Sequence, residues 1–261
     1  MEIGQIERAT QNRIIQLFVN RLGFTYLGDW EEYPTNSNVE EKYLIPYLKK
    51  SGYNDTLIRK AIYELKQAAN SITDDLYTNN QKVYKMLRYG VSVKEDVGVN
   101  FQSVQLINWK DIEANDFGIA EEVTVFGQKE KRPDLVLYVN GIALCIIELK
   151  RGIKDVTEGI RQNLNNQKAE FIRPFFNTVQ LVIAGNDSQG LRYGTTDTPE
   201  KMFLTWKEET YNNEELFPID KHLLQLCNKQ RLMEIVYDYI LFDGGIKKLC
   251  RPHQYLSLIH I

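Results

Sequence analysis

The chain has 261 residues, of which 43% are hydrophobic and 26% are charged, and its formal net charge is −3. This composition is typical of a globular protein with a sizeable core, and the charge excludes a protein that binds polyanions through its overall charge. The three cysteines show neither a disulfide framework nor zinc-ligand spacing, and there is no signal peptide or 18-residue apolar run. A reducing cytoplasm is therefore the expected location.

The first third of the chain has the apolar periodicity of helices. Helices are predicted over residues 6–22, from Asn38 to about residue 50, over 55–69 and over 76–89. Residues 26–37 are predicted to form a loop because Asn, Ser and Pro cluster there. Glu41 falls on the apolar stripe of the second helix. It is either a first-turn residue favoured by the helix dipole or a residue that points into a site and helps to hold metal or water.

Strands are predicted next, over residues 104–108 and 119–126, followed by a hairpin over residues 132–151. The hairpin turn is Asn140-Gly141, the strongest short-range signal for this motif. Its second strand is apolar from Ile142 to Ile147, as expected of a strand covered on both faces. That strand ends in Glu148 and Lys150, and the first strand opens with Pro133-Asp134, so three charged groups are expected at one end of the hairpin.

These three charged groups suit metal-dependent cleavage of phosphodiesters. Asp134 and Glu148, on neighbouring strands, are candidates to hold Mg²⁺ through hard oxygen ligands. Such a metal makes a bound water more acidic, and Lys150 can orient that water or stabilise charge on the phosphate. Each piece also has an ordinary interpretation, because Pro-Asp is usually a turn and Glu-x-Lys at a strand end is usually a solvated rim.

The register of the hairpin decides whether the two carboxylates share a face. A two-residue loop at Asn140-Gly141 pairs residues whose numbers sum to 281, and Asp134 then points away from Glu148. A three-residue loop with Gly141 as a left-handed bulge changes the sum to 280 and brings both carboxylates to one face. We therefore predict an odd register or an irregularity near Asp134. A regular two-residue hairpin would count against the metal site.

After the hairpin, a helix that carries Gln162 is predicted over residues 156–171, and strands over 178–184 and 191–195. This order of elements indicates an α/β fold with the charged strand ends at one sheet edge. Nine Lys or Arg occur between residues 128 and 173 against six Asp or Glu, an excess that permits phosphate contact. The candidates for DNA binding are Arg132, Arg151, Lys154 and Arg161.

The last quarter of the chain is different in character. From Trp206 a polar acidic loop leads into helical patterns over residues 223–226 and 231–242. No strand is predicted before Gly244-Gly245, and the GxxxxGK[ST] motif is absent, so no ATP site is expected. The three histidines show no metal-ligand spacing and are expected to be incidental.

The stretches RPDLVLYVNG and IIELKR resemble the PD-(D/E)xK nuclease motif of the R subunit of type I restriction enzymes. Further blocks resemble the N-terminal region of that subunit in the same order: IERATQNR, YLGDWEEY, NSNVEEKYL, LRYGVSVK, INWKDIEANDFGIAEEV, GIRQNLNNQ, VQLVIAGNDSQGLRYGT and KKLCRPHQY. The resemblance covers nearly the whole chain, and an ordered series of blocks is far more specific than one motif.

The resemblance implies a restriction-endonuclease-like core, with a mixed central sheet flanked by helices, an N-terminal helical region and a C-terminal helical connector. It implies that Asp134, Glu148 and Lys150 are catalytic and that the two carboxylates are the metal ligands. Glu41 matches a helix glutamate found ahead of such cores. Gln162 matches the glutamine of the family's Gln-x-x-x-Tyr motif, which helps to position DNA, and Asn166 stands at the tyrosine position.

In that family the nuclease domain cuts double-stranded DNA with Mg²⁺, and a RecA-like motor that follows it uses ATP. The subunit docks on methyltransferase (M) and specificity (S) subunits, where S-adenosylmethionine binds. Residues 1–205 are expected to be the nuclease domain and 206–261 a connector toward a motor that this fragment lacks, so ATP and S-adenosylmethionine are not expected to bind here. Two alternatives stay open: a non-cleaving DNA-docking or assembly module, and a repair or mobile-element nuclease on the same core.

Overall fold

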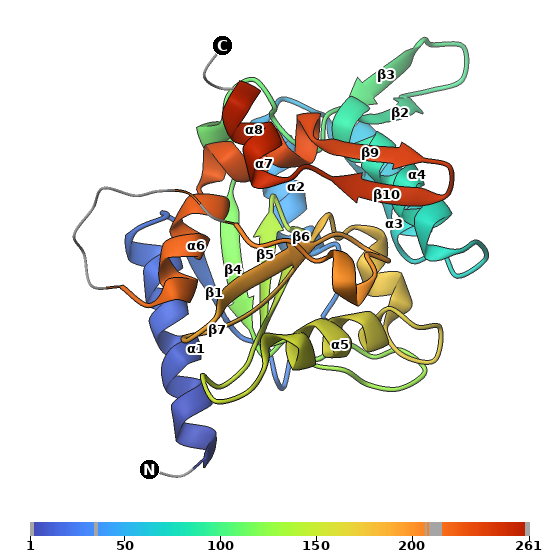
Figure 1. Cartoon of the computed structure of the whole chain (residues 1–261). Helices are drawn as coiled ribbons and strands as arrows, with labels where there is room; N and C mark the ends of the chain where they lie inside the picture. Colours follow the sequence, from blue (N-terminus) through green and yellow to red (C-terminus); the bar gives the residue numbers. More distant parts are fainter. Residues whose placement is uncertain (1–2, 34–35, 207, 209–215, 259–261) are drawn as a thin grey trace.

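A mixed six-stranded sheet forms the centre of the molecule (Figure 1). The computed structural model describes residues 3–33, 36–206, 208 and 216–258. The sheet order is β1 (Thr25–Asp29), β4 (Phe117–Glu121), β5 (Leu135–Val139), β6 (Ile142–Leu149), β7 (Leu181–Asn186) and β8 (Gly190–Gly194). β1 runs parallel to β4 and β6 parallel to β7, and the other neighbours are antiparallel. The predicted α/β class with a mixed central sheet is confirmed.

Helices cover both faces of this sheet. On one face α5 (Val156–Asn166) packs on β6 and β7. On the other, α1 (Ile3–Asn20) and α6 (Pro218–Leu226) pack side by side, to the left of the sheet in Figure 1. Alternate strand residues divide between two cores, with Ala120, Val136, Ile146 and Val182 in the core beneath α5 and Ile119, Leu137, Ile147 and Ile183 in the larger opposite core.

The predicted N-terminal helical region is present, and the C-terminal region is largely helical. The first consists of α1, α2 (Glu41–Lys50), α3 (Asp55–Ala69) and α4 (Leu76–Tyr89), followed by a hairpin of β2 (Val91–Lys94) and β3 (Phe101–Val104). The second consists of α6, α7 (Lys229–Asp238), a hairpin of β9 (Ile240–Asp243) and β10 (Ile246–Leu249), and α8 (Pro252–Leu258). Short 3₁₀ helices occupy Ile112–Ala114, Arg173–Asn177 and Glu200–Met202.

Several predictions about local structure are wrong. The strand predicted over residues 104–108 shares only Val104 with β3, and the helix predicted over 156–171 ends at Asn166. Residues 26–37, predicted to be a loop, contain most of β1, whose edge position leaves it largely uncovered and without an apolar pattern. The helix predicted over 231–242 ends at Asp238, and β9 precedes Gly244-Gly245, whose positive φ angles form a tight hairpin turn. Residues 209–215 of the predicted acidic loop lie outside the described residues. A domain boundary at residue 205 stays a prediction.

The β5–β6 hairpin has the predicted turn but not the predicted register. Val139 pairs with Ile142, so Asn140 and Gly141 form a two-residue turn, in which their φ angles are 52° and 81°. The predicted three-residue loop is therefore wrong. An irregularity does occur, however, because Leu137 pairs with Cys145 whereas Tyr138 pairs with Ala143. Leu144 is thus the extra residue of a β-bulge within the strand.

This bulge changes which face of the sheet the following side chains of β6 point to. Leu144 and Cys145 both belong to the larger core, and Ile146 then faces α5. Beyond the bulge the numbers of paired residues sum to 282, which continues the ladder to Asp134 opposite Glu148. Without the extra residue, Glu148 would point to the opposite face from Asp134. The bulge therefore brings the two carboxylates together.

Candidate metal centre

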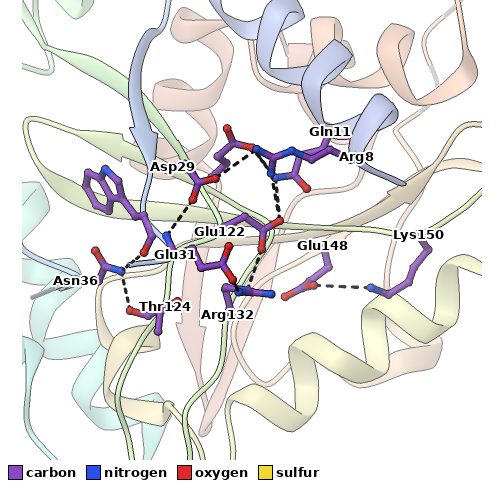
Figure 2. Close-up of polar contacts among 12 residues, drawn as sticks. Arg8, Gln11, Asp29, Glu31, Asn36, Glu122, Thr124, Arg132, Glu148 and Lys150 are labelled. Atoms are coloured by element: carbon purple, nitrogen blue, oxygen red, sulfur yellow. Dashed lines mark hydrogen bonds and ion pairs between the residues drawn. The ribbon is translucent and has the colours of Figure 1, made fainter. Parts of the chain in front are cut away.

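The three residues predicted to be catalytic converge at the open end of the β5–β6 hairpin. Asp134 Oδ2 accepts a hydrogen bond of 2.6 Å from the backbone N–H of Leu149, next to Glu148. Lys150 Nζ lies 3.9 Å from Glu148 Oε2 and donates to the Leu149 carbonyl at 2.9 Å (Figure 2). The bulge and the short turn thus place two carboxylates and one ammonium group in a single cluster.

Glu148 is the unusual member of this cluster. Its side chain is 0% exposed, and among the described residues neither carboxylate oxygen has a hydrogen-bond partner. Burial, followed by the negative charge of Asp134, raises the pKa of Glu148 well above its ordinary value. Desolvation also raises the pKa of Asp134 to about 6, against the opposing charge of Lys150. A buried carboxylate without a hydrogen-bond partner is costly, and the ion pair with Lys150 at 3.9 Å offsets part of that cost.

Helix α5 packs directly on the cluster at Gly159. A Cβ at this position would lie 3.1 Å from Ala184 Cβ, 3.4 Å from Lys150 Cγ and 3.6 Å from Glu148 Cβ. Glycine therefore lets the helix cover these side chains at van der Waals distance. Gln162 is half-buried one turn further along α5. Asn166, at the position of the family's tyrosine, is 1% exposed and ends the helix.

Glu41 does not join this cluster. It lies in the first turn of α2, and its carboxylate is paired with Lys66. The preceding residue, Glu40, donates its backbone N–H to the Gly141 carbonyl at 2.7 Å, so this helix begins beside the hairpin turn. The turn and the carboxylate cluster are at opposite ends of β6, roughly 20 Å apart at about 3.3 Å per residue. The interpretation of Glu41 as a first-turn residue is the one that the structure supports.

The predicted DNA-binding cations all have partners within the chain. Arg132 pairs with Glu31 and, at 2.9 Å, with Glu122 (Figure 2). Lys154 lies 3.3 Å from Glu158, and Arg161 binds Glu200 through two nitrogens at 2.9 and 2.7 Å. Arg151 is half-buried. A phosphate would therefore have to compete with these carboxylates for the cations.

Sequence reasoning missed a third acidic residue, which lies beside the two carboxylates of the cluster. Glu122, just after β4, donates its backbone N–H to the Asp134 carbonyl at 2.9 Å. Its carboxylate accepts from Gln11 Nε2 at 3.1 Å and lies 3.7 Å from Arg8, both on α1. The available signal was the pair Glu121-Glu122, which ends a buried strand as Glu148 does.

Residues 4–201 of the chain match the family model described as the type I restriction enzyme R protein N terminus. The chain belongs to this family. One relative is the putative MjaVIIIP endonuclease subunit of Methanocaldococcus jannaschii, which is 28% identical over 86% of the chain. Another is the HindI endonuclease subunit of Haemophilus influenzae, which is 27% identical over 74% of the chain. Both are named as type I restriction enzyme subunits, and the chain spans 22% and 20% of their respective lengths.

The cluster in this R-protein N terminus fits a hard divalent cation. Across the described ranges, no three His, Cys, Asp or Glu side chains are grouped to hold a metal ion. Asp134 and Glu148 are a pair of carboxylates. Mg²⁺ is commonly held by one or two carboxylates, with waters and phosphate oxygens at its other positions. The two oxygens of Glu148, which have no hydrogen-bond partner, are hard donors of the kind that this ion prefers.

Within the described ranges, no helix is long and apolar enough to cross a membrane.

Proposed function

We propose that this chain is the Mg²⁺-dependent endonuclease domain of a type I restriction enzyme R subunit, and that it hydrolyses phosphodiesters of double-stranded DNA. The observation that carries the proposal is the Glu148 carboxylate, which is fully buried, lacks a hydrogen-bond partner and lies beside Asp134 and Lys150. A structural carboxylate would be hydrogen-bonded or solvated. The missing hydrogen bonds support a role for this carboxylate as a ligand of a cation.

Asp134 and Glu148 would hold the metal ion. When bound, Mg²⁺ makes a water more acidic and stabilises the charge that develops on the phosphate. Lys150, whose ammonium lies next to Glu148, orients the attacking water and stabilises the same charge. The Leu149 N–H holds Asp134 in place, and α5 shields the cluster from bulk water on one side. Gln162, on this helix, is proposed to help position the DNA.

The proposed partners follow from the same chemistry. Arg132, Arg151, Lys154 and Arg161 are proposed to contact phosphates, which position DNA without reading its sequence. Recognition of sequence would therefore belong to partner M and S subunits. ATP is assigned to another part of such a complex, since the GxxxxGK[ST] motif is absent from the chain, and S-adenosylmethionine is assigned to the partner subunits.

Calorimetric titration of Mg²⁺ or Mn²⁺ into the chain, with a short DNA duplex present, tests the proposal. The wild-type protein is expected to bind the ion saturably, and Glu148→Ala is expected to lose this binding. Glu41→Ala is the matched control, because it removes an acidic side chain that lies at the other end of β6. Equal weak heats for wild type and Glu148→Ala would instead favour a non-cleaving DNA-docking module. The convergence of the three charged groups already argues against that alternative.

A further inference from the structure

Acidic residues lie opposite one another at the ends of three adjacent strands. The register of β4 with β5 continues to Glu122 opposite Asp134, and the Glu122 N–H bonds the Asp134 carbonyl at 2.9 Å. The register of β5 with β6 continues to Asp134 opposite Glu148. Neighbouring strands are about 4.8 Å apart, so the backbones of these three residues form a short row.

The backbone of Glu122 departs from the strand conformation. Its φ angle is 49°, in the left-handed region, which costs a residue other than glycine roughly 1–2 kcal/mol. Local strain of this kind is concentrated at functional sites, where the surrounding structure fixes it. Here the backbone hydrogen bond to the Asp134 carbonyl holds this conformation.

The Glu122 side chain is held in place but retains capacity for a further bond. Its carboxylate lies between Gln11 on α1 and Arg132, at 3.1 and 2.9 Å respectively, and its side chain is 17% exposed (Figure 2). A carboxylate can accept about four hydrogen bonds, so the two oxygens can take another donor.

We propose that Glu122 is the third carboxylate of the metal centre and that it accepts a hydrogen bond from a water that the metal binds. This inference rests on the proposed function. The independent sign that the row meets a ligand is the carboxylate of Glu148, which is fully buried and has no hydrogen-bond partner among the described residues. Contact through water is the expected mode, because no three acidic side chains of the described residues are grouped to bind an ion directly. Mg²⁺ usually keeps several of its waters.

Two neighbouring glutamates provide matched controls. Glu121 precedes Glu122, but its carboxylate binds Arg8 and Gln11 on α1, both at 2.8 Å, and the Tyr26 hydroxyl. Glu31 shares Arg132 with Glu122, yet its side chain is 53% exposed and it does not belong to the row. Glu31→Gln therefore disturbs Arg132 as Glu122→Gln does, without removing charge from the metal centre.

The test is the affinity of the chain for Mn²⁺, titrated by calorimetry with a short duplex present. Groups that orient metal ligands without touching the metal contribute about 10–100-fold to affinity, so Glu122→Gln should weaken binding by about tenfold. Glu121→Gln and Glu31→Gln should bind as wild type does. Glu122→Asp should recover part of the affinity, since a carboxylate can still reach through water. Thermal unfolding of all four variants in chelator verifies that the fold is intact.

The outcomes separate this inference from the proposed function. If Glu148→Ala loses binding while Glu122→Gln binds as wild type does, Glu122 has no part in the centre and the nuclease assignment stands. If Glu31→Gln weakens binding as much as Glu122→Gln, the effect belongs to Arg132 and the inference is wrong. If the wild-type chain binds no Mn²⁺, the proposed function and the inference both fail.

Discussion

The two ends of the β5–β6 hairpin differ in the hydrogen bonding of their buried polar side chains. At the turn, Asn140 is 0% exposed, and its amide donates to Leu106 O at 3.0 Å and to Asn115 Oδ1 at 2.8 Å. Its Oδ1 accepts from the Asp116 N–H at 2.8 Å. At the open end, Glu148 is equally buried, yet neither of its oxygens has a hydrogen-bond partner within the described residues, and Lys150 lies 3.9 Å away as an ion-pair partner.

This contrast distinguishes a structural polar group from one that awaits a ligand. A buried polar group with all its hydrogen bonds made stabilises one conformation, whereas a buried carboxylate whose oxygens accept no hydrogen bond destabilises the fold. The turn end therefore fixes the hairpin in place. At the open end, the buried carboxylate of Glu148 lowers the stability of the fold, and a bound cation would offset this loss. Four predictions test this division.

The largest effect is expected at the open end. In a complex with partner subunits, Asp134→Ala, Glu148→Ala and Lys150→Ala should each lower DNA cutting by about 10²–10³-fold or more, because each removes charge that acts in the transition state. Glu41→Ala should cut at the wild-type rate, since it pairs with Lys66 at the turn end. Cutting is measured on a plasmid, with circular dichroism to check the fold. Full activity in any of the three variants would remove that residue from the site.

At the turn end the expected loss is one of stability. Asn140→Ala should lower the free energy of unfolding by about 3 kcal/mol, because it leaves buried partners unpaired and places alanine at positive φ. Asn140→Gly keeps the backbone conformation accessible and isolates the contribution of the amide bonds. Urea denaturation measures both variants. A loss below about 1 kcal/mol for Asn140→Ala would show that the turn network is not stabilising.

The pH dependence of stability should show how much the ionised carboxylates at the open end of the hairpin destabilise the fold. The pKa values of Asp134 and Glu148 are raised in the folded state, so the folded protein binds more protons than the unfolded chain. In chelator, the stability that these two groups contribute should therefore be complete below about pH 4. It should be lost as the pH rises, through about 6 for Asp134 and at higher pH for Glu148.

Removal of the Glu148 charge should reduce the loss of stability that accompanies rising pH. Glu148→Gln should be more stable than wild type at pH 8 by about 1–2 kcal/mol and similar near pH 4, because a neutral amide replaces a buried charge. Glu31→Gln, at an exposed site, should keep the wild-type slope. Thermal unfolding at both pH values measures these differences. A less stable Glu148→Gln protein at pH 8 would contradict the assignment of Glu148 as an unsatisfied charge.

The smallest effects are expected at the surface cations. Lys154→Ala and Arg161→Ala should leave thermal stability unchanged, since exposed ion pairs contribute little. Each should weaken duplex binding modestly and lower the slope of log affinity against log salt by about one. Lys248→Ala is the control, because Lys248 pairs with Asp243 on the β9–β10 hairpin. Fluorescence anisotropy at several salt concentrations measures the slopes, and equal slopes in all proteins would exclude these cations from the DNA interface.

Local patterns in the sequence were sufficient for the elements that carry the site. Asn140-Gly141 predicts the turn, and the apolar run from Ile142 predicts a buried strand ending in Glu148 and Lys150. Helix α5 and the strands β7 and β8 also follow from periodicity. Each of these signals comes from neighbouring residues, which is why it can be recognised without knowledge of the rest of the fold.

Tertiary structure alone decided how the charged residues meet. Leu144 and Cys145 are both apolar, so nothing in the sequence marks the bulge that turns Glu148 toward Asp134. The same holds for Glu41 and Glu122, whose helix or strand could be predicted but whose distance from Glu148 could not. Strand register and helix docking depend on contacts between residues far apart in the chain. A one-residue change in register reverses every side chain of a strand, and only the packed sheet selects one alternative.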